Sequence, residues 1–263
     1  MPNNNEYTIY ICEGTGCVSG KSHEIRLALE HKIAEQGLNN VKVDFTGCHG
    51  FCEQGPIAII EPDEIFYTRL TINDVDEIVQ SHIMEGKPVE RLFFKDPISN
   101  RSIPYYRDIN FYRKQQRIIL RNCGHINPEK IEDYIEREGY NALKKVLGQM
   151  TSLQIIEEIK QSGLRGRGGA GFPTGMKWEF CQKEQSDIKY MICNADEGDP
   201  GAFMDRSIME ADPHTVIEGM TIAAYAIGAG EGYIYIRAEY PLAVKRLRIA
   251  LQQSENMGFI GDN

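Results

Sequence analysis

Short apolar runs and amphipathic stretches alternate along the first third of the chain, and their spacing predicts its secondary structure. Ile25, Leu29 and Ile33 recur at helical spacing and would share one buried face. Ser22 is a suitable N-cap for this helix, and Gly37 is a suitable stop. The same reasoning predicts four short strands and a final helix, at residues 7–11, 41–45, 57–60, 66–70 and 73–85. The resulting order predicts a small α/β domain over residues 1–88.

Residues 126–263 also alternate between helical and strand patterns. Asn127 and Pro128 form a typical helix start, and Gly139 follows as a stop. Further helices and two short apolar strands are predicted, the helices at residues 152–162, 177–182, 213–227 and 241–255 and the strands at residues 190–193 and 233–237. We therefore expect a second α/β domain over residues 126–263, joined to the first by a connector over residues 89–125.

The composition is that of a globular protein. The 263-residue chain is 41% hydrophobic and 25% charged, and its net charge is −9. This charge disfavours general binding to nucleic acid or to an anionic membrane surface. No apolar run approaches about 18 residues, so no membrane insertion is expected. Seven cysteines without a secretion signal indicate reduced thiols and a cytoplasmic location.

The connector is basic and aromatic. Residues 91–121 include eight basic and two acidic residues, with six Phe or Tyr side chains among them. Basic residues interleaved with aromatic ones can bind single-stranded nucleic acid. The acidic remainder of the chain favours a different interpretation, in which the aromatics pack on a neighbouring domain and the arginines meet acidic surface. Cys123, which stands alone, is expected to be a core thiol.

Four cysteines follow two of the predicted strands in pairs. Cys12 and Cys17 are spaced C-x4-C, and Cys48 and Cys52 are spaced C-x3-C. Short loops at strand ends let several thiolates converge on one point, so the pairs predict a metal site. The spacing alone leaves both an iron–sulfur cluster and a structural zinc ion open, while unrelated buried cysteines are the least favoured interpretation. His49 is a further potential ligand, but a histidine in a tight loop is more often solvated.

Residues 163–178 combine glycine with positive charge. Six of these sixteen residues are glycine, and Arg165, Arg167 and Lys177 lie among them. Glycine permits positive φ angles and close approach to a ligand, so successive N–H groups can surround a phosphate. The preceding segment is helical rather than a strand, and Met176 interrupts the P-loop pattern, so neither common nucleotide motif applies. Taken alone, this stretch is either a phosphate-binding loop or a long flexible turn. The residues that follow it favour the first, so we expect it to hold a phosphorylated cofactor.

The predicted strand at residues 190–193 leads into an acidic loop. Asp196, Glu197 and Asp199 are compatible with a solvated turn that includes a helix cap, which is the commoner role of such residues, or with a divalent-metal site. A third interpretation is that they and Asn194 form hydrogen bonds with ribose hydroxyls and with the polar edge of a flavin ring. The loop taken by itself leaves these three interpretations open.

The two loops together resemble one known family. GLRGRGGAGFPTGMKW at residues 163–178, followed by NADEGDPGAFMDR at residues 194–206, is similar to the NADH-binding FMN/iron–sulfur flavoprotein subunit of complex I. The chain most resembles the relatives in electron-bifurcating iron hydrogenases and NAD-dependent formate dehydrogenases, where a thioredoxin-like [2Fe–2S] ferredoxin domain precedes the flavin domain. The resemblance implies a [2Fe–2S] cluster held by Cys12, Cys17, Cys48 and Cys52.

The resemblance also implies cofactor roles in the second half of the chain, with no catalytic side chain because the cofactors carry the reaction. FMN would be held by Gly166, Arg167, Gly168, Gly169, Lys177, Asn194 and Asp196. The nicotinamide nucleotide, NAD(H), would have its adenine between Phe172 and Phe180, with Glu197 and Asp199 beside its pocket. Asp199 is a shorter acid than the glutamate usual in complex I.

The implied function is that of an NADH-oxidising electron-transfer subunit in a soluble multisubunit oxidoreductase. Its partners would be other iron–sulfur subunits of a hydrogenase, a formate dehydrogenase or a complex I-like assembly. Family members continue well past residue 263, so we expect an incomplete flavin domain with exposed apolar sheet edges, unless a C-terminal partner completes it. The alternatives are a [2Fe–2S] electron carrier with a non-functional flavin half, and a zinc-stabilised interaction protein.

Overall fold

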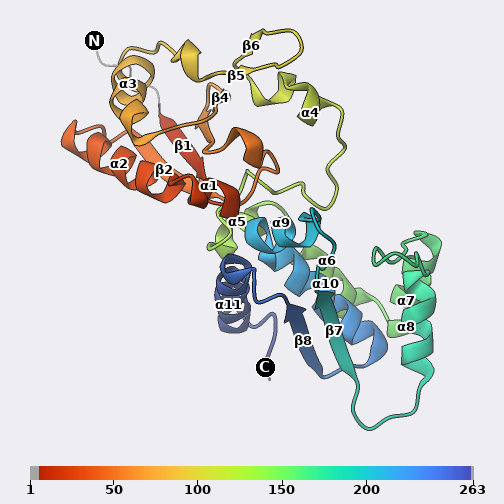
Figure 1. Ribbon diagram of the computed structural model, residues 1–263. Helices are drawn as coiled ribbons and strands as arrows, with labels where there is room; N and C mark the ends of the chain where they lie inside the picture. Colours follow the sequence, from red (N-terminus) through yellow and green to blue (C-terminus); the bar gives the residue numbers. More distant parts are fainter. Residues whose placement is uncertain (1–5, 262–263) are drawn as a thin grey trace. The chain divides into compact units, whose positions relative to one another are not determined.

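The computed structural model describes residues 6–261, which form two compact units. The first unit comprises the chain up to Pro128 together with Glu210–Asp212, and the second comprises Glu129–Met209 and the chain from Pro213 onward. The connector range, residues 89–125, lies in the first unit. Each unit mixes helices and strands, in agreement with the predicted α/β class (Figure 1).

The first unit is built around a four-stranded sheet in the order β2-β1-β3-β4. β1 pairs with β2 in parallel, and the other neighbouring strands are antiparallel. Its strands are β1 (Tyr7–Cys12), β2 (Val41–Thr46), β3 (Ala58–Glu61) and β4 (Ile65–Tyr67), with a separate hairpin of β5 (Phe94–Lys95) and β6 (Ser102–Ile103). Its α-helices are α1 (Thr15–Ser19), α2 (Ser22–Glu35), α3 (Val75–Glu77) and α4 (Asn110–Arg113). The predicted face of α2 is buried, at Ile25, Leu29 and Ile33.

The helix predicted at residues 73–85 is divided into three kinds of helical turn. A 3₁₀ turn, η2 (Ile72–Asp74), is followed by α3 and then by a π-helix, η3 (Ile78–Met84). Hydrogen bonds between Thr71 and Asp74 form a capping box at the start. Three further 3₁₀ turns occur in this unit, η1 (Cys52–Gln54), η4 (Glu90–Leu92) and η5 (Tyr106–Asp108). A helical period in the sequence does not distinguish these variants, because all of them bury a similar stripe of apolar residues.

The buried His82 of η3 is expected to make the first unit sensitive to acid. Its Nδ1 is 2.8 Å from the Tyr67 hydroxyl, and its Nε2 is 3.0 Å from an Asp63 carboxylate oxygen. Burial lowers the pKa of His82 from 6.5, and the bond with Asp63 opposes this shift. Because the folded pKa lies below the unfolded one, the stabilisation is complete above 6.5 and is lost as the pH falls through the folded value.

Urea unfolding, followed by far-UV circular dichroism at a series of pH values, tests this expectation. The free energy of unfolding should decrease from neutral pH to about pH 5, and His82→Gln should weaken that dependence. The exposed His31 offers a matched control, since His31→Gln should keep the original pH dependence. An unaltered pH dependence in His82→Gln would contradict the assignment.

The second unit contains a parallel two-stranded sheet surrounded by helices. Its strands are β7 (Tyr190–Ala195) and β8 (Glu231–Ile236). Its helices are α5 (Ile131–Glu136), α6 (Asn141–Gln149), α7 (Ser152–Gln161), α8 (Thr174–Lys183), α9 (Met204–Ala211), α10 (Pro213–Ile227) and α11 (Pro241–Asn256). α6 and α9 were not predicted. No helix within residues 6–261 is both long enough and apolar enough to cross a membrane.

The helix start predicted at Asn127 and Pro128 is wrong. α5 begins at Ile131, and Asn127 is buried in the first unit. The Asn127 side-chain amide donates a hydrogen bond to an Asp44 carboxylate oxygen at 2.6 Å. Asn127 therefore bonds a distant strand rather than the first turn of the following helix.

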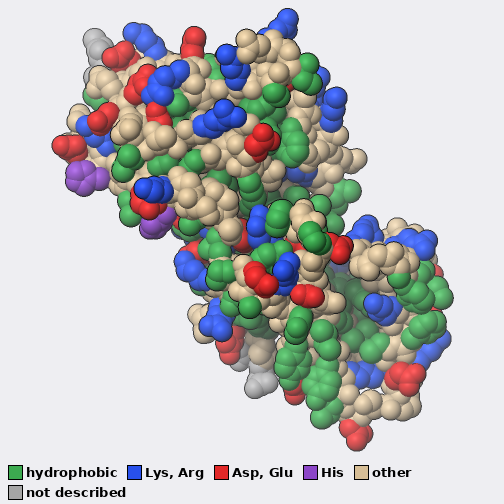
Figure 2. Space-filling model, viewed as in Figure 1, with side chains coloured by type: hydrophobic (Ala, Val, Ile, Leu, Met, Phe, Trp, Pro, Cys, Tyr) green, Lys and Arg blue, Asp and Glu red, His purple; other side chains and the backbone are tan. Residues whose placement is uncertain are grey.

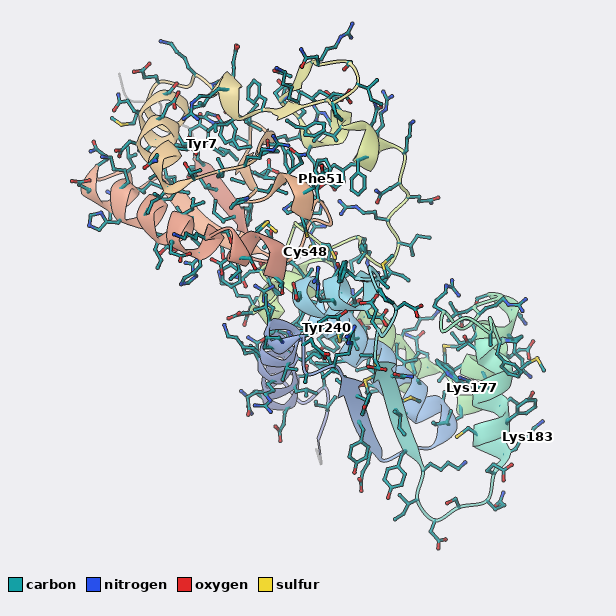
Figure 3. All side chains as sticks on the ribbon, in the orientation of Figure 1. Tyr7, Cys48, Phe51, Lys177, Lys183 and Tyr240 are labelled. Carbon is teal, nitrogen blue, oxygen red and sulfur yellow. The ribbon has the colours of Figure 1, made fainter. Side chains whose placement is uncertain are left out.

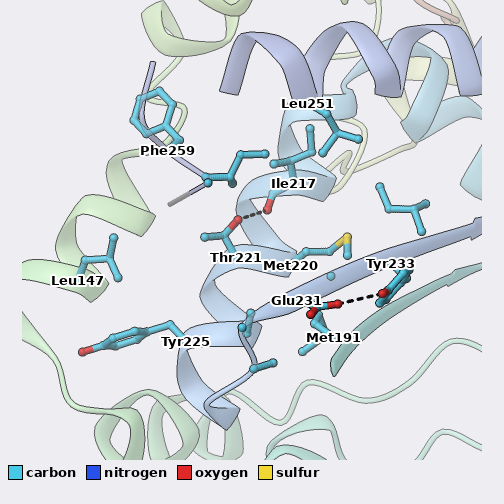
Figure 4. A pocket seen from close by; sticks show the side chains of 17 residues that line it. Leu147, Met191, Ile217, Met220, Thr221, Tyr225, Glu231, Tyr233, Leu251 and Phe259 are labelled. Atoms are coloured by element: carbon cyan, nitrogen blue, oxygen red, sulfur yellow. Dashed lines mark hydrogen bonds between the residues drawn. The ribbon is translucent and has the colours of Figure 1, made fainter. Parts of the chain in front are cut away.

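One face of the second unit's sheet is exposed and apolar. Tyr190, Ile192, Tyr233 and Tyr235 are 47–65% exposed, and apolar side chains gather over β7 and β8 in Figure 2. A cavity of about 620 Å³ lies along β8 and α10 (Figure 4). Its lining includes Met191, Ile217, Met220, Tyr233, Leu251 and Phe259, and contains none of the residues predicted to hold FMN or NAD(H).

Candidate cofactor sites

The four predicted ligand cysteines lie on two loops at one edge of the first unit's sheet. Cys12 ends β1 and Cys17 lies in α1, while Cys52 begins η1. Cys48, labelled in Figure 3, follows β2. β1 and β2 are parallel neighbours, so their carboxyl ends bring the two loops to the same edge. The sulfur atoms of Cys48 and Cys52 are 3.7 Å apart, and the Cys12 thiol donates a hydrogen bond to the carbonyl of Gly47, which directly precedes Cys48, at 3.4 Å.

The chemistry of these thiols fits a [2Fe–2S] cluster. Each iron of such a cluster takes two protein ligands, and the structure presents two pairs of cysteines. Within the described residues, no group of three or more His, Cys, Asp or Glu side chains has the geometry to hold one metal ion. Hydrogen bonding between paired thiols, followed by burial, raises the pKa of Cys12 and of Cys48. Cluster assembly must therefore displace protons from these thiols.

Glycine is needed where the two cysteine loops meet. A Cβ atom on Gly14 would lie 2.7 Å from Cβ of Cys48, and one on Gly55 would lie 2.7 Å from the sulfur of Cys17. The Gly50 N–H donates a hydrogen bond to the Cys48 sulfur at 3.3 Å. The space between the loops therefore suits sulfur ligands and backbone donors, which is the environment that tunes iron–sulfur clusters.

The connector covers the second cysteine loop with aromatic side chains. Phe51 of that loop stacks on Phe111 with 4.9 Å between ring centroids, and Tyr112 meets Phe51 edge-on at 5.5 Å. The guanidinium of Arg117 lies 5.3 Å from the Tyr112 ring centroid. Two other connector arginines pair with acids of the same unit, Arg91 with Asp74 and Arg107 with Glu64. The aromatics and arginines of the connector thus contact the first unit, to which the connector itself belongs.

Two single residues near this loop are buried. Cys123 is 1% exposed, as predicted for a core thiol, and burial raises its pKa to about 12. His49 is only 2% exposed, so the expectation that it is solvated is wrong. Its ring meets Phe66 and Tyr106 edge-on, and burial lowers its pKa to about 3. No local signal predicts this burial, because the rings come from other parts of the chain.

The glycine-rich stretch forms an exposed loop between α7 and α8. The Gly166 N–H donates to the Phe172 carbonyl at 2.8 Å, so the loop closes on itself. Gly169 and Gly171 have positive φ angles of 98° and 60°. A Cβ atom on Gly168 would meet no other atom within 4 Å. The backbone is thus open on the side that a phosphate would approach.

The cations and aromatic rings that are predicted to bind the flavin and the nucleotide lie in this loop or in the helix that follows it. α8 begins at Thr174, earlier than the predicted residue 177, so the loop leads straight into a helix N-terminus that favours anions. Lys177 is exposed in the first turn of α8 (Figure 3), and Arg167 donates to the Arg165 carbonyl. Phe172 and Phe180 are 42% and 52% exposed, with 6.4 Å between ring centroids. The structure therefore brings these two rings together beside the loop.

The acidic loop follows β7, and its members differ in exposure. Asn194 and Asp196 are exposed, and the Asn194 side-chain oxygen accepts a hydrogen bond from the Asp196 N–H at 3.1 Å. Asp199 is also exposed. These side chains are accessible to a ligand from solvent.

Glu197 is buried and already engaged. Its two carboxylate oxygens accept hydrogen bonds from the N–H groups of Asp205 and Arg206, at 3.0 and 3.2 Å. The Tyr240 hydroxyl donates to the same carboxylate at 3.3 Å, and Arg237 donates to the Glu197 carbonyl at 2.6 Å. Glu197 therefore caps the first turn of α9, in agreement with the helix-cap interpretation of this loop.

Two known domain families match the chain. Residues 2–82 match the family described as thioredoxin-like [2Fe–2S] ferredoxin, and residues 159–260 match the family described as Nuo51 FMN-binding domain. The chain joins a [2Fe–2S] ferredoxin domain to a Nuo51-type FMN-binding domain. The resemblance inferred from the two loops is thereby confirmed, and the match of residues 2–82 favours the [2Fe–2S] cluster over zinc.

Several known proteins are similar to this [2Fe–2S]/FMN chain. The NADP-reducing hydrogenase subunit HndC of Solidesulfovibrio fructosivorans is 57% identical over 57% of this chain and 30% of its own length. The NAD-reducing hydrogenase HoxS subunit alpha of Cupriavidus necator is 34% identical over 97% of this chain and 41% of its own length. A solved thioredoxin-like [2Fe–2S] ferredoxin from Aquifex aeolicus is 31% identical, covers 34% of this chain and 89% of its own, and has a TM-score of 0.32. The chain thus spans 30–41% of the length of these two curated relatives.

Sequence reasoning missed an acid that contacts the first cysteine loop. Glu210 is completely buried in the first unit, where its carboxylate accepts hydrogen bonds from the backbone and the side chain of Thr15. The two residues are 195 positions apart in the sequence. Local patterns do not reveal contacts at such separations, so only the structure identifies Glu210.

Proposed function

We propose that this chain supplies the nucleotide-oxidising, electron-entry part of a multisubunit oxidoreductase. One observation carries the proposal: a loop that matches an FMN-binding domain and a four-cysteine site that matches a [2Fe–2S] ferredoxin occur on one chain. When bound, FMN would accept a hydride from NADH and release single electrons to iron–sulfur clusters. The partners would be other iron–sulfur subunits of a hydrogenase, a formate dehydrogenase or a complex I-like assembly, in the cytoplasm.

The glycine-rich loop would bind the FMN phosphate. Gly168 and Gly169 are exposed, so their N–H groups would bond anionic oxygens, and the N-terminus of α8 adds its positive end. Gly166 would keep the loop in shape, because its own N–H is bonded to the Phe172 carbonyl. Arg167 and Lys177 would contribute charge-assisted hydrogen bonds. These residues bind and orient the cofactor, and none of them needs to change its protonation during the reaction.

The acidic loop and the two phenylalanines would place the flavin ring and the nucleotide. Asn194 and Asp196 would bond the ring edge and the ribityl hydroxyls, since both side chains are exposed. Phe172 and Phe180 would hold the adenine by stacking, and Asp199 would lie at the nucleotide pocket. Glu197 would act there by fixing the loop, because its carboxylate caps α9.

The visible absorption spectrum of the anaerobically purified chain tests this proposal. The spectrum would be recorded alone, after adding FMN, and after adding NADH or NADPH in parallel samples. We expect a broad iron–sulfur spectrum, retention of added FMN through gel filtration, and bleaching of the flavin band by one of the nucleotides. A chain that holds the cluster but neither retains nor bleaches FMN would contradict nucleotide oxidation.

One observation favours a second candidate function, that of an electron carrier without flavin activity. The first unit buries three of its four ligand cysteines beside an enclosed apolar core, whereas the sheet of the second unit has two strands and an exposed apolar face. In this case the cluster would cycle with artificial electron donors, while NADH-dependent dye reduction would remain absent after FMN addition.

The variant Gly168→Ala is expected to weaken FMN binding without destabilising the protein. A Cβ atom on Gly168 meets nothing within 4 Å, so any effect must arise where the ligand would lie. Steric exclusion of the phosphate should weaken FMN binding about tenfold, which corresponds to about 1.4 kcal/mol. Fluorescence titration gives the affinity, and thermal unfolding followed through Trp178, the single tryptophan, gives the stability.

Gly230→Ala is the matched control for this substitution. Gly230 also lies in an exposed loop of the second unit with no atom within 4 Å of an added Cβ. It should leave both FMN affinity and thermal stability unchanged. If Gly168→Ala bound FMN with the same affinity as the unmodified chain, Gly168 would not contact the FMN phosphate.

A further inference from the structure

Glu210 presents a buried carboxylate to the loop that carries Cys12 and Cys17. The Thr15 N–H donates to one carboxylate oxygen at 2.9 Å, and the Thr15 hydroxyl donates to the other at 2.5 Å. Thr15 lies between the two cysteines at the start of α1. Both oxygens of Glu210 therefore contact the residue around which this cysteine loop turns.

The two residues after Glu210 keep this carboxylate in place. A Cβ atom on Gly47 would lie 2.1 Å from Cα of Ala211, so the backbone after Glu210 packs directly on the residue that precedes Cys48. The Asn122 side-chain amide donates to an Asp212 carboxylate oxygen at 2.8 Å, and Asp212 is fully buried. Glu210–Asp212 thus contact both cysteine loops within the first unit.

The field of Glu210 also reaches the second cysteine pair. Ala211, the residue that follows Glu210, packs directly against Gly47, which precedes Cys48. The carboxylate is 0% exposed, so water screens it little. The negative charge of Glu210 would therefore disfavour the addition of an electron to a cluster held by these cysteines.

We propose that Glu210 is a positioning residue that lowers the reduction potential of the [2Fe–2S] cluster through its fixed negative charge beside the first cysteine loop. Reduction adds one electron, and hence one negative charge, to the cluster, and breaks no bond. Charge and hydrogen bonds near the cluster are among the factors that set its potential. This inference rests on the cluster and not on nucleotide oxidation, so the two proposals fail independently.

The test is a redox titration of the full chain with its cluster, followed by the electron paramagnetic resonance signal of the reduced state. Glu210→Gln removes the charge and keeps the size. We expect the reduction potential of its cluster to rise by about 59 mV. For a one-electron couple, this shift raises the ratio of reduced to oxidised cluster about tenfold at the same solution potential. Glu210→Asp keeps the charge and should restore most of the original potential.

Thr15→Val supplies a prediction of opposite sign. It removes the hydroxyl dipole that offsets part of the Glu210 charge, while the backbone donor remains to hold the carboxylate. The potential of Thr15→Val should therefore shift slightly downward. A purely structural role for Glu210 would not produce opposite shifts in these two variants.

Three results would overturn the inference. These are an unchanged potential in Glu210→Gln with an intact signal, equal shifts in the Gln and Asp variants, and an unchanged or raised potential in Thr15→Val. If Glu210→Gln assembles no cluster, the sign of the Thr15→Val shift alone decides.

Discussion

Replacing Gly14 by alanine is expected to abolish assembly of the [2Fe–2S] cluster. The added Cβ would lie 2.7 Å from Cβ of Cys48 and 3.0 Å from its Cα, where no flexible side-chain end can move aside. Overpacking of this kind costs about 1–3 kcal/mol. The first cysteine loop must therefore move away from the second, and the two thiol pairs separate. Iron and acid-labile sulfide per chain should fall at least about tenfold, as measured by chemical analysis and visible circular dichroism.

Gly148→Ala is the control for this prediction. Gly148 lies in α6 and has no atom within 4 Å of an added Cβ, so the substitution should leave the iron content unchanged. Far-UV circular dichroism would show whether Gly14→Ala is still folded, which separates loss of the cluster from loss of the domain. Full iron content in Gly14→Ala would show that the two loops do not meet at this point during assembly.

The sequence predicts the cluster site well because its main determinants are local. Cys12 and Cys48 each follow an apolar strand directly, and parallel pairing of those strands is enough to bring both loops to one edge. The predicted strand at residues 66–70 is shifted, since β4 covers Ile65–Tyr67, but this changes no ligand position. Spacing and strand ends therefore suffice wherever neighbouring residues decide the geometry.

The parts that sequence reasoning missed depend on contacts between distant residues. Asn127 has the side chain of a helix cap, yet it bonds Asp44 of β2 instead. His49 is polar and lies in a tight loop, yet aromatic rings from β4 and the connector bury it. Glu210 shows no local pattern, although it contacts the cluster loop. Tertiary packing overrides local preference at each of these positions.

The sequence predicts which residue types form the candidate flavin site, but it does not predict which of their side chains are exposed. The glycine run indicates an open loop, and the structure has one next to the N-terminus of α8. The acidic loop, in contrast, looks uniform in the sequence, while the structure buries Glu197 and exposes Asp196 and Asp199. This difference arises from α9, whose first N–H groups need an acceptor and take the Glu197 carboxylate.

Replacing Glu218 by alanine is expected to cause the largest loss of stability in the second unit. The buried Glu218 carboxylate accepts hydrogen bonds from the Tyr134 hydroxyl at 2.5 Å and from the N–H groups of Tyr140 and Leu143 at 2.9 and 3.0 Å. A buried donor left without an acceptor costs about 1–3 kcal/mol. With three donors affected, we expect the free energy of unfolding to fall by about 3–5 kcal/mol.

Urea unfolding followed through Trp178 measures this loss, because the single tryptophan lies in α8 of the second unit. Glu218→Gln keeps one accepting oxygen and should lose less stability than Glu218→Ala. The exposed Glu136 of α5 is the control, and Glu136→Ala should change the free energy of unfolding by less than about 0.5 kcal/mol. If Glu218→Ala unfolded at the same urea concentration as Glu136→Ala, the hydrogen bonds of the Glu218 carboxylate to Tyr140 and Leu143 would not stabilise the second unit.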